Sequence, residues 1–194
     1  MSIVLVGSTS GSITLQEPAV AGTTTIDLPA TSGTLITTGT TGQVIASGAL
    51  PIGSVLQVVS ATTATTVSNS TGTYADTGLT ATITPKFSTS KILVMATING
   101  TLKATNNTCI KTQLVRNSTA ILAIDDYAGI TGTTTSNGVG SVSCDYLDSP
   151  ATTSATTYKV QFASDNANAI VYVQGFNNVT NGSNSTMVLM EIAQ

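Results

Sequence analysis

The chain has 194 residues, a formal net charge of −3 and only 8% charged residues, and its mean hydropathy is +0.30. Average soluble domains carry about 25% charged residues, so this chain has too little charge to cover the surface of a monomer, which favours burial of apolar surface between protein subunits. Its six scattered cations exclude a surface that neutralises a nucleic-acid backbone, and no apolar run approaches the roughly 18 residues of a membrane helix.

Residues 1–50 differ from the rest of the chain and predict an extended attachment arm. The opening run Met1–Gly7 has no basic region and is too short for a secretory signal, so we expect synthesis in a cytoplasm. Short units follow, each an apolar three-residue strand closed by a Pro or Gly turn. Such strands bury too little to be stable alone, so they need sister chains or a partner's surface; a flexible Thr/Gly-rich leader is the alternative. The residues expected to pack there are Ile13, Leu15, Ile26, Leu28, Leu35 and Ile36.

From residue 51 to residue 194, strand signals recur about every ten residues, which is the spacing of an all-β sandwich or jelly roll. No stretch shows a convincing helical period, so helix should be almost absent. We therefore predict an antiparallel β-sandwich over residues 51–194, preceded by the arm over 1–50. The expected strands cover residues 54–60, 64–69, 79–84, 91–99, 108–116, 119–125, 139–147, 156–164, 169–176 and 185–192.

The stretch 77–100 holds the two clearest strands and the turn between them. In the first strand apolar residues alternate with threonine from Leu79 to Thr84, which predicts one buried face. Pro85 and the turn formers after it end that strand. The second strand is apolar on nearly both faces, which suits a central strand covered by a second sheet or by another subunit. Its inner face should lie opposite Val160 and Phe162; this face comprises Ile92, Val94, Ala96 and Ile98.

Catalytic motifs are missing from the sequence. The chain has no histidine, so Ser-His-Asp and Cys-His catalysis and ordinary zinc sites are excluded. Ser88 and Lys91 have the S-x-x-K spacing, but they lie on a hairpin rather than at the start of a helix and no companion motif follows. We expect no enzyme activity, no metal and no cofactor.

Acidic residues and tyrosines supply the remaining ligand candidates. Asp125 and Asp126 are adjacent, and Asp145 and Asp148 are three residues apart. A carboxylate cluster of this kind can hold Ca²⁺ or act as a glycosidase pair. Turn formation and solubility are the commoner roles of such aspartates.

Aromatic residues beside these acids suggest a second ligand class. Tyr127 next to Asp125 and Asp126, and Tyr146 next to Asp145, can offer aromatic platforms and acceptors to a sugar, with core or interface packing as the alternative.

Two cysteines, Cys109 and Cys144, complete the reactive residues. In a reducing compartment we expect them as free thiols buried in strands; a disulfide between them is the alternative. Neither belongs to a metal or redox motif.

Several blocks together resemble a domain recurrent in structural proteins of tailed-bacteriophage virions, often described as tail-fibre or appendage proteins. The Ile-Thr-Leu…Pro-Ala…Gly units of the arm also resemble repeats of phage fibre-like proteins. This resemblance implies a homotrimer of jelly-roll or tumour-necrosis-factor-like domains and supplies no catalytic residues. The blocks are residues 74–85, 90–94, 114–119, 146–150, 157–161 and 187–192.

Two positions on the particle remain open. An arm of roughly 50 residues joined to one domain leaves little reach for a tail fibre, so we expect a capsid-bound decoration, either a cement protein or a head fibre. Its partners would be its own copies and the major capsid protein, on the surface of a virion made in a bacterial cytoplasm. The alternative is a short tail fibre that binds a host-surface glycan.

Overall fold

A computed structural model describes residues 2–6, 12–16, 50–175 and 182–194. The chain divides into two compact units, residues 1–43 and residues 44–194. In the first unit, β1 (Ser2–Val6) and β2 (Ser12–Gln16) form an antiparallel pair in which Ser2 lies opposite Gln16. The division at residue 50 expected from the sequence stays a prediction.

The second unit is built from strands alone in its described part, as the sequence predicts. The described residues contain no helix that is long and apolar enough to cross a membrane. The strands are β3 (Val55–Thr63), β4 (Val67–Asn69), β5 (Ala75–Ile83), β6 (Lys91–Lys103), β7 (Thr108–Arg116), β8 (Thr119–Thr131), β9 (Asn137–Asp148), β10 (Thr156–Ser164), β11 (Val171–Val173) and β12 (Ser185–Ile192).

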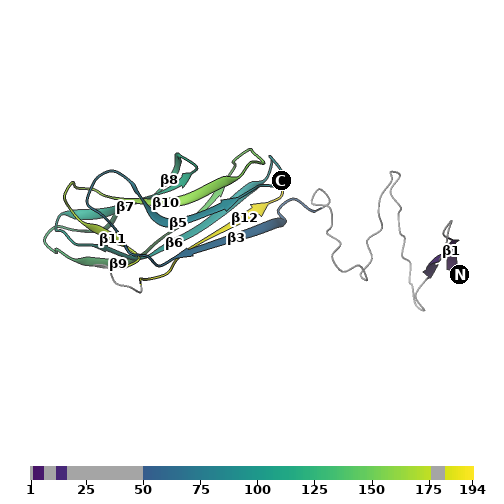
Figure 1. The fold of residues 1–194 in the computed structure, drawn as a ribbon, viewed down its shortest axis with the longest axis horizontal. Coiled ribbons are helices and arrows are strands. Elements are labelled where there is room, and N and C mark those ends of the chain that lie inside the picture. The colour runs from purple at the N-terminus through teal and green to yellow at the C-terminus, as the bar shows by residue number, and fades with distance from the viewer. Residues whose placement is uncertain (1, 7–11, 17–49, 176–181) are drawn as a thin grey trace. The chain divides into compact units, whose positions relative to one another are not determined.

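These strands form two antiparallel sheets packed as a sandwich, as Figure 1 shows. One sheet has the order β5-β10-β7-β8; the other has the order β3-β12-β6-β11-β4, with β9 on the free side of β6. The pairs are nested: β7 pairs β8, β6 pairs β9, β5 pairs β10 and β3 pairs β12. A long antiparallel hairpin rolled over itself gives this pairing, which is the topology of a jelly roll.

The core lies between the sheets and confirms the predicted inner faces. Thr80 and Thr82 of β5 are exposed, while Leu79, Ala81 and Ile83 are buried. Alternation places every second side chain of a strand on the same face, and one buried cluster accordingly joins the two sheets. It includes Ile92, Val94, Ala96 and Ile98 from β6 together with Tyr158, Val160 and Phe162 from β10.

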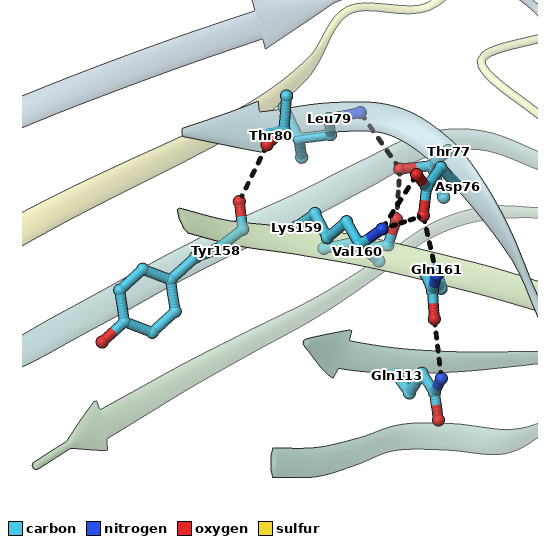
Figure 2. Close-up of polar contacts among 9 residues, drawn as sticks. All are labelled: Asp76, Thr77, Leu79, Thr80, Gln113, Tyr158, Lys159, Val160 and Gln161. Carbon is cyan, nitrogen blue, oxygen red and sulfur yellow. Dashed lines mark hydrogen bonds and ion pairs between the residues drawn. The ribbon is translucent and has the colours of Figure 1, made fainter. Parts of the chain in front are cut away.

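A bulge explains why β5 begins four residues earlier than the alternation predicts. Between Asp76 and Thr80, β5 has more residues than the facing part of β10, and Gly78 takes a φ of +84° that side chains rarely adopt. The buried hydroxyl of Thr77 supplies hydrogen bonds where the ladder between β5 and β10 is interrupted. It donates to the Val160 carbonyl and accepts from the Leu79 N–H (Figure 2).

The two shortest strands are shorter than expected. β4 pairs only with β11, over three residues, and β11 also pairs with the end of β6 over two residues, so only part of each predicted strand joins the ladder.

Candidate interaction surface

An apolar row crosses the outer face of the sheet that contains β3, β12, β6 and β9. Alternate residues of these strands are buried in the core, so the residues between them face outward. The pairing register aligns four such outward positions, one from each strand. We call this set the outer row; it comprises Val58, Met190, Leu93 and Leu147.

The rows on either side show where the apolar surface ends. Toward the start of β3, the next outward row is Val55, Ile192 and Lys91. On the other side it is Ser60, Val188, Met95 and Asp145, and beyond that come Thr62, Thr186, Thr97 and Ser143. The face is therefore apolar over its first rows and polar further along the strands.

Sequence reasoning found only part of this surface. It indicated that the strand over 91–99 is apolar on nearly both faces, which includes Leu93 and Met95, but it did not single out Val58, Met190 or Leu147. Each of these is one apolar residue on the outward side of its own strand, so only the register between strands reveals that they lie side by side.

The outer face of the other sheet carries side chains that bond to one another instead (Figure 2). Gln113 on β7 donates to Gln161 on β10 at 2.9 Å, and Gln161 donates to Asp76 on β5 at 2.7 Å. Lys159 forms an ion pair with Asp76 at 2.8 Å. The hydrogen bond from Lys159 is the main reason that the pKa of Asp76 is lowered.

A polar network around the buried Asp148 carboxylate connects the two sheets at one end of the sandwich. Arg116 of β7 donates to both carboxylate oxygens of Asp148 on β9, at 2.9 and 2.8 Å. The hydroxyl of Tyr158 on β10 donates to the same carboxylate at 2.7 Å. Burial, followed by this hydrogen bond, raises the pKa of Tyr158. Because all three groups are partnered, the network serves packing between sheets.

A second buried carboxylate, that of Glu191 on β12, holds the turn between β5 and β6. It accepts hydrogen bonds from the backbone N–H groups of Lys86 and Phe87 and from Gln57 Nε2. Burial acts to raise the pKa of Glu191, but the hydrogen bonds to its carboxylate outweigh this effect, and the pKa is lowered.

The four residues predicted to contact a ligand lie in different environments. Tyr127 on β8 is 71% exposed, and its N–H donates to the Asp125 carboxylate. Asp126 is exposed beside it, near Tyr74, whose pKa is raised by burial and then by the charge of Asp126. Tyr146 instead is half-buried and packs against the core. Tyr74 was not among the predicted ligand residues.

The structure separates the second pair of acidic residues. Asp148 is buried in the network with Arg116, whereas Asp145 faces outward in the row that contains Met95. A spacing of three residues places two side chains on opposite faces of a strand, so these two carboxylates do not share a site. Among the described residues, no group of three or more His, Cys, Asp or Glu side chains is arranged to hold a metal ion.

Neither cysteine is paired. Cys109 is buried in β7 and donates to the Asp126 carbonyl, and Cys144 is half-buried in β9. Burial first, and nearby aspartate second, raises the pKa of each thiol to about 11. Both thiols are therefore protonated and weakly nucleophilic at neutral pH.

The S-x-x-K residues lie where the sequence places them, around a turn. Ser88 is exposed in the turn between β5 and β6, and Lys91 is the first residue of β6.

Of the six residues expected to pack in the arm, Ile13 and Leu15 lie in β2. The other four, Ile26, Leu28, Leu35 and Ile36, lie outside the described residues. Their proposed role in attachment stays a prediction.

No protein-family model matches the chain, and no curated protein sequence matches it. Among solved structures, it is similar to the VP2 subviral particle of infectious bursal disease virus, with a TM-score of 0.46 and 10% identity over 71% of this chain and 32% of that one. It is also similar to the structures of the Gx and Gt strains of that virus. The Gx structure has a TM-score of 0.38 and 14% identity over 71% of this chain and 38% of that one. The Gt structure has a TM-score of 0.39 and 13% identity over 98% of this chain and 46% of that one. The chain thus spans less than half the length of these proteins, and the likeness concerns the fold alone.

Proposed function

We propose that this chain is a non-enzymatic structural protein of a bacteriophage particle. In this proposal it is a homotrimer that decorates the capsid, as a cement protein or head fibre, and residues 1–50 attach it to the major capsid protein. The observation that carries the proposal is the outer row on the sandwich of a chain with only 8% charged residues. Apolar side chains aligned across four strands need another protein surface to cover them.

The other described parts of the chain support an assembly role. The buried acids Asp148 and Glu191 are both taken up by contacts within the fold, and both cysteines are weak nucleophiles at neutral pH. The chain has no histidine to serve as a general base. The resemblance of the sequence blocks to tailed-phage virion proteins supplies the type of particle.

Electron cryomicroscopy of particles that carry this protein tests the location. We expect copies that follow the symmetry of the capsid, in groups of three. Copies found only on the tail would contradict capsid decoration and favour the tail-fibre alternative.

Deleting residues 1–50 tests whether the arm attaches the protein to the particle and whether the sandwich folds and forms a trimer without it. The β-sandwich core lies after residue 51, so residues 51–194 should remain a folded trimer by circular dichroism and sedimentation but should not bind particles that lack the protein. Failure to fold would place the arm in the core, and undiminished binding would place attachment in the sandwich.

A short tail fibre that binds a host-surface glycan is the second candidate. The observation in its favour is Tyr127, which is 71% exposed next to Asp125 and Asp126, because an exposed ring beside carboxylates suits the stacking and hydrogen bonding of a sugar. Binding of the full chain to an array of bacterial surface glycans, lost in Tyr127→Ala but kept in Ile130→Ala, would support this candidate. Ile130 is a matched control because it is 53% exposed on the same strand.

A further inference from the structure

Exposed apolar side chains are concentrated on one face of the sandwich. The described residues include eight large hydrophobic side chains that are exposed, and four of them, Val55, Val58, Met95 and Leu147, face outward from β3, β6 and β9. They lie in the outer row or in the rows next to it. Single exposed hydrophobic residues are ordinary, but a contiguous group marks an interaction site.

We propose that this face, formed by the outward side chains of β3, β12, β6 and β9, is the surface through which copies of the chain pack against one another. The inference rests on the proposed homotrimer and names the surface that holds it together.

The size of the face fits the centre of such an interface. Four strands spaced about 4.8 Å apart, over about five residues, cover roughly 300 Å². A stable interface takes about 800 Å² from each partner, with an apolar centre and a polar rim. The outer row and its neighbours supply the centre, and the Ser and Thr rows further along the strands supply part of the rim.

The charges on the face favour a second copy as the occupant. The face carries one cation, Lys91, and one anion, Asp145, on opposite sides of the outer row, and neither forms an ion pair among the described residues. The two charges cancel over the face, and both lie outside the outer row, where solvent screens like charges of neighbouring copies from one another.

The direction of the outer row suits a threefold arrangement. The row runs across the strands, at the same level in each of them. Three copies with their strands aligned along a common axis therefore bring their rows to one height, where the apolar side chains close a layer around the axis.

Charge insertion in the full-length protein tests the face. Val58→Asp and Leu147→Asp place an uncompensated charge in the outer row, so we expect each to raise the trimer dissociation constant at least tenfold by sedimentation equilibrium. The matched control is Ala123→Asp. Ala123 is exposed on β8 opposite Gln113, which belongs to the polar face of the other sheet, so this variant should stay trimeric.

Thiol labelling gives a second measurement that does not depend on dissociation. The natural thiols have pKa values raised to about 11, so they react slowly with maleimide at pH 7. We expect Val58→Cys to label at least ten times more slowly than Ala123→Cys in the assembled protein. Equal labelling rates, together with Asp variants that remain trimers, would overturn the inference while leaving the trimer intact.

The remaining outcomes separate this inference from the proposed function. A wild-type monomer with Val58→Cys freely labelled in solution but protected on particles would overturn it, because the face would then contact another particle protein. A wild-type dimer that Val58→Asp dissociates would support the face and contradict the threefold count.

Discussion

The two outer faces of the sandwich satisfy their side chains in different ways. On the sheet of β5, β10 and β7, the residues Asp76, Gln161 and Gln113 bond to one another across the strands. On the sheet of β3, β12, β6 and β9, the corresponding positions form the apolar outer row. A hydrogen-bonded row is stable in contact with water, whereas an apolar row gains free energy only when another surface covers it. The comparison therefore distinguishes a face that is stable in contact with solvent from the face that we propose meets another copy of the chain.

The largest expected effect tests whether inner and outer positions are assigned correctly. Phe162→Ala removes a fully buried ring from the core beneath both faces, and the cavity should lower the free energy of unfolding by about 3–5 kcal/mol. Ser88→Ala, at an exposed turn position, should cost under about 1 kcal/mol. Denaturant midpoints measured at one protein concentration check both values, and equal shifts would mean that the faces are misassigned.

A matched pair on β9 compares the two sides of a single strand. Asp148→Asn leaves Arg116 without its carboxylate partner inside the sandwich, so we expect a loss of about 2–3 kcal/mol. Asp145→Asn, on the outer side of the strand, should change stability by less than about 0.5 kcal/mol. Urea denaturation of the two variants distinguishes them; a similar loss from both would contradict the opposite placement of these carboxylates.

Glu191 gives a pH-dependent contribution on the inner side of β12. Its pKa is lowered in the folded protein from the ordinary value of 4.5. Its charged form therefore contributes stability above about pH 4.5, and that contribution is lost as the pH falls through the lower, folded value. Glu191→Gln should cost about 1–2 kcal/mol at pH 7 because its bonds to the Lys86 and Phe87 N–H groups weaken.

The measurement for Glu191 is stability against pH. At pH 3 the difference between Glu191→Gln and the wild type should shrink relative to pH 7. A difference that stays constant over this range would show that the carboxylate charge does not act on the turn.

The smallest effect belongs to the polar outer face. Asp76→Asn removes the ion pair with Lys159, but the Asp76 side chain is 54% exposed, so solvent screening should limit the loss to under about 1 kcal/mol. The pKa of Asp76 is lowered in the folded protein, as is that of Glu191. The loss caused by Asp76→Asn should therefore also diminish below about pH 4. Thermal unfolding in low and high salt checks it, since the loss should be smaller in high salt.

Much of the fold follows from alternation along the strands. Three predicted strands, 108–116, 156–164 and 185–192, have the boundaries found in the structure, because turn-forming residues such as Asn and Ser lie beside each of these apolar segments. The inner faces of β6 and β10 follow for the same reason. The start of β5 was missed because the bulge at Gly78 depends on how β10 pairs with it.

The sequence by itself determined that the described part of the second unit is a β-sandwich and which side chains of β5, β6 and β10 face inward, because a period of two residues depends on neighbours along the chain alone. Only the tertiary structure decided which outward side chains become neighbours. Val58 and Leu147 are 89 positions apart in the numbering of the chain, and the nested pairing of the jelly roll aligns them through β12 and β6. The outer row depends on register between strands, and register is set by turns, bulges and the packing of the whole sandwich.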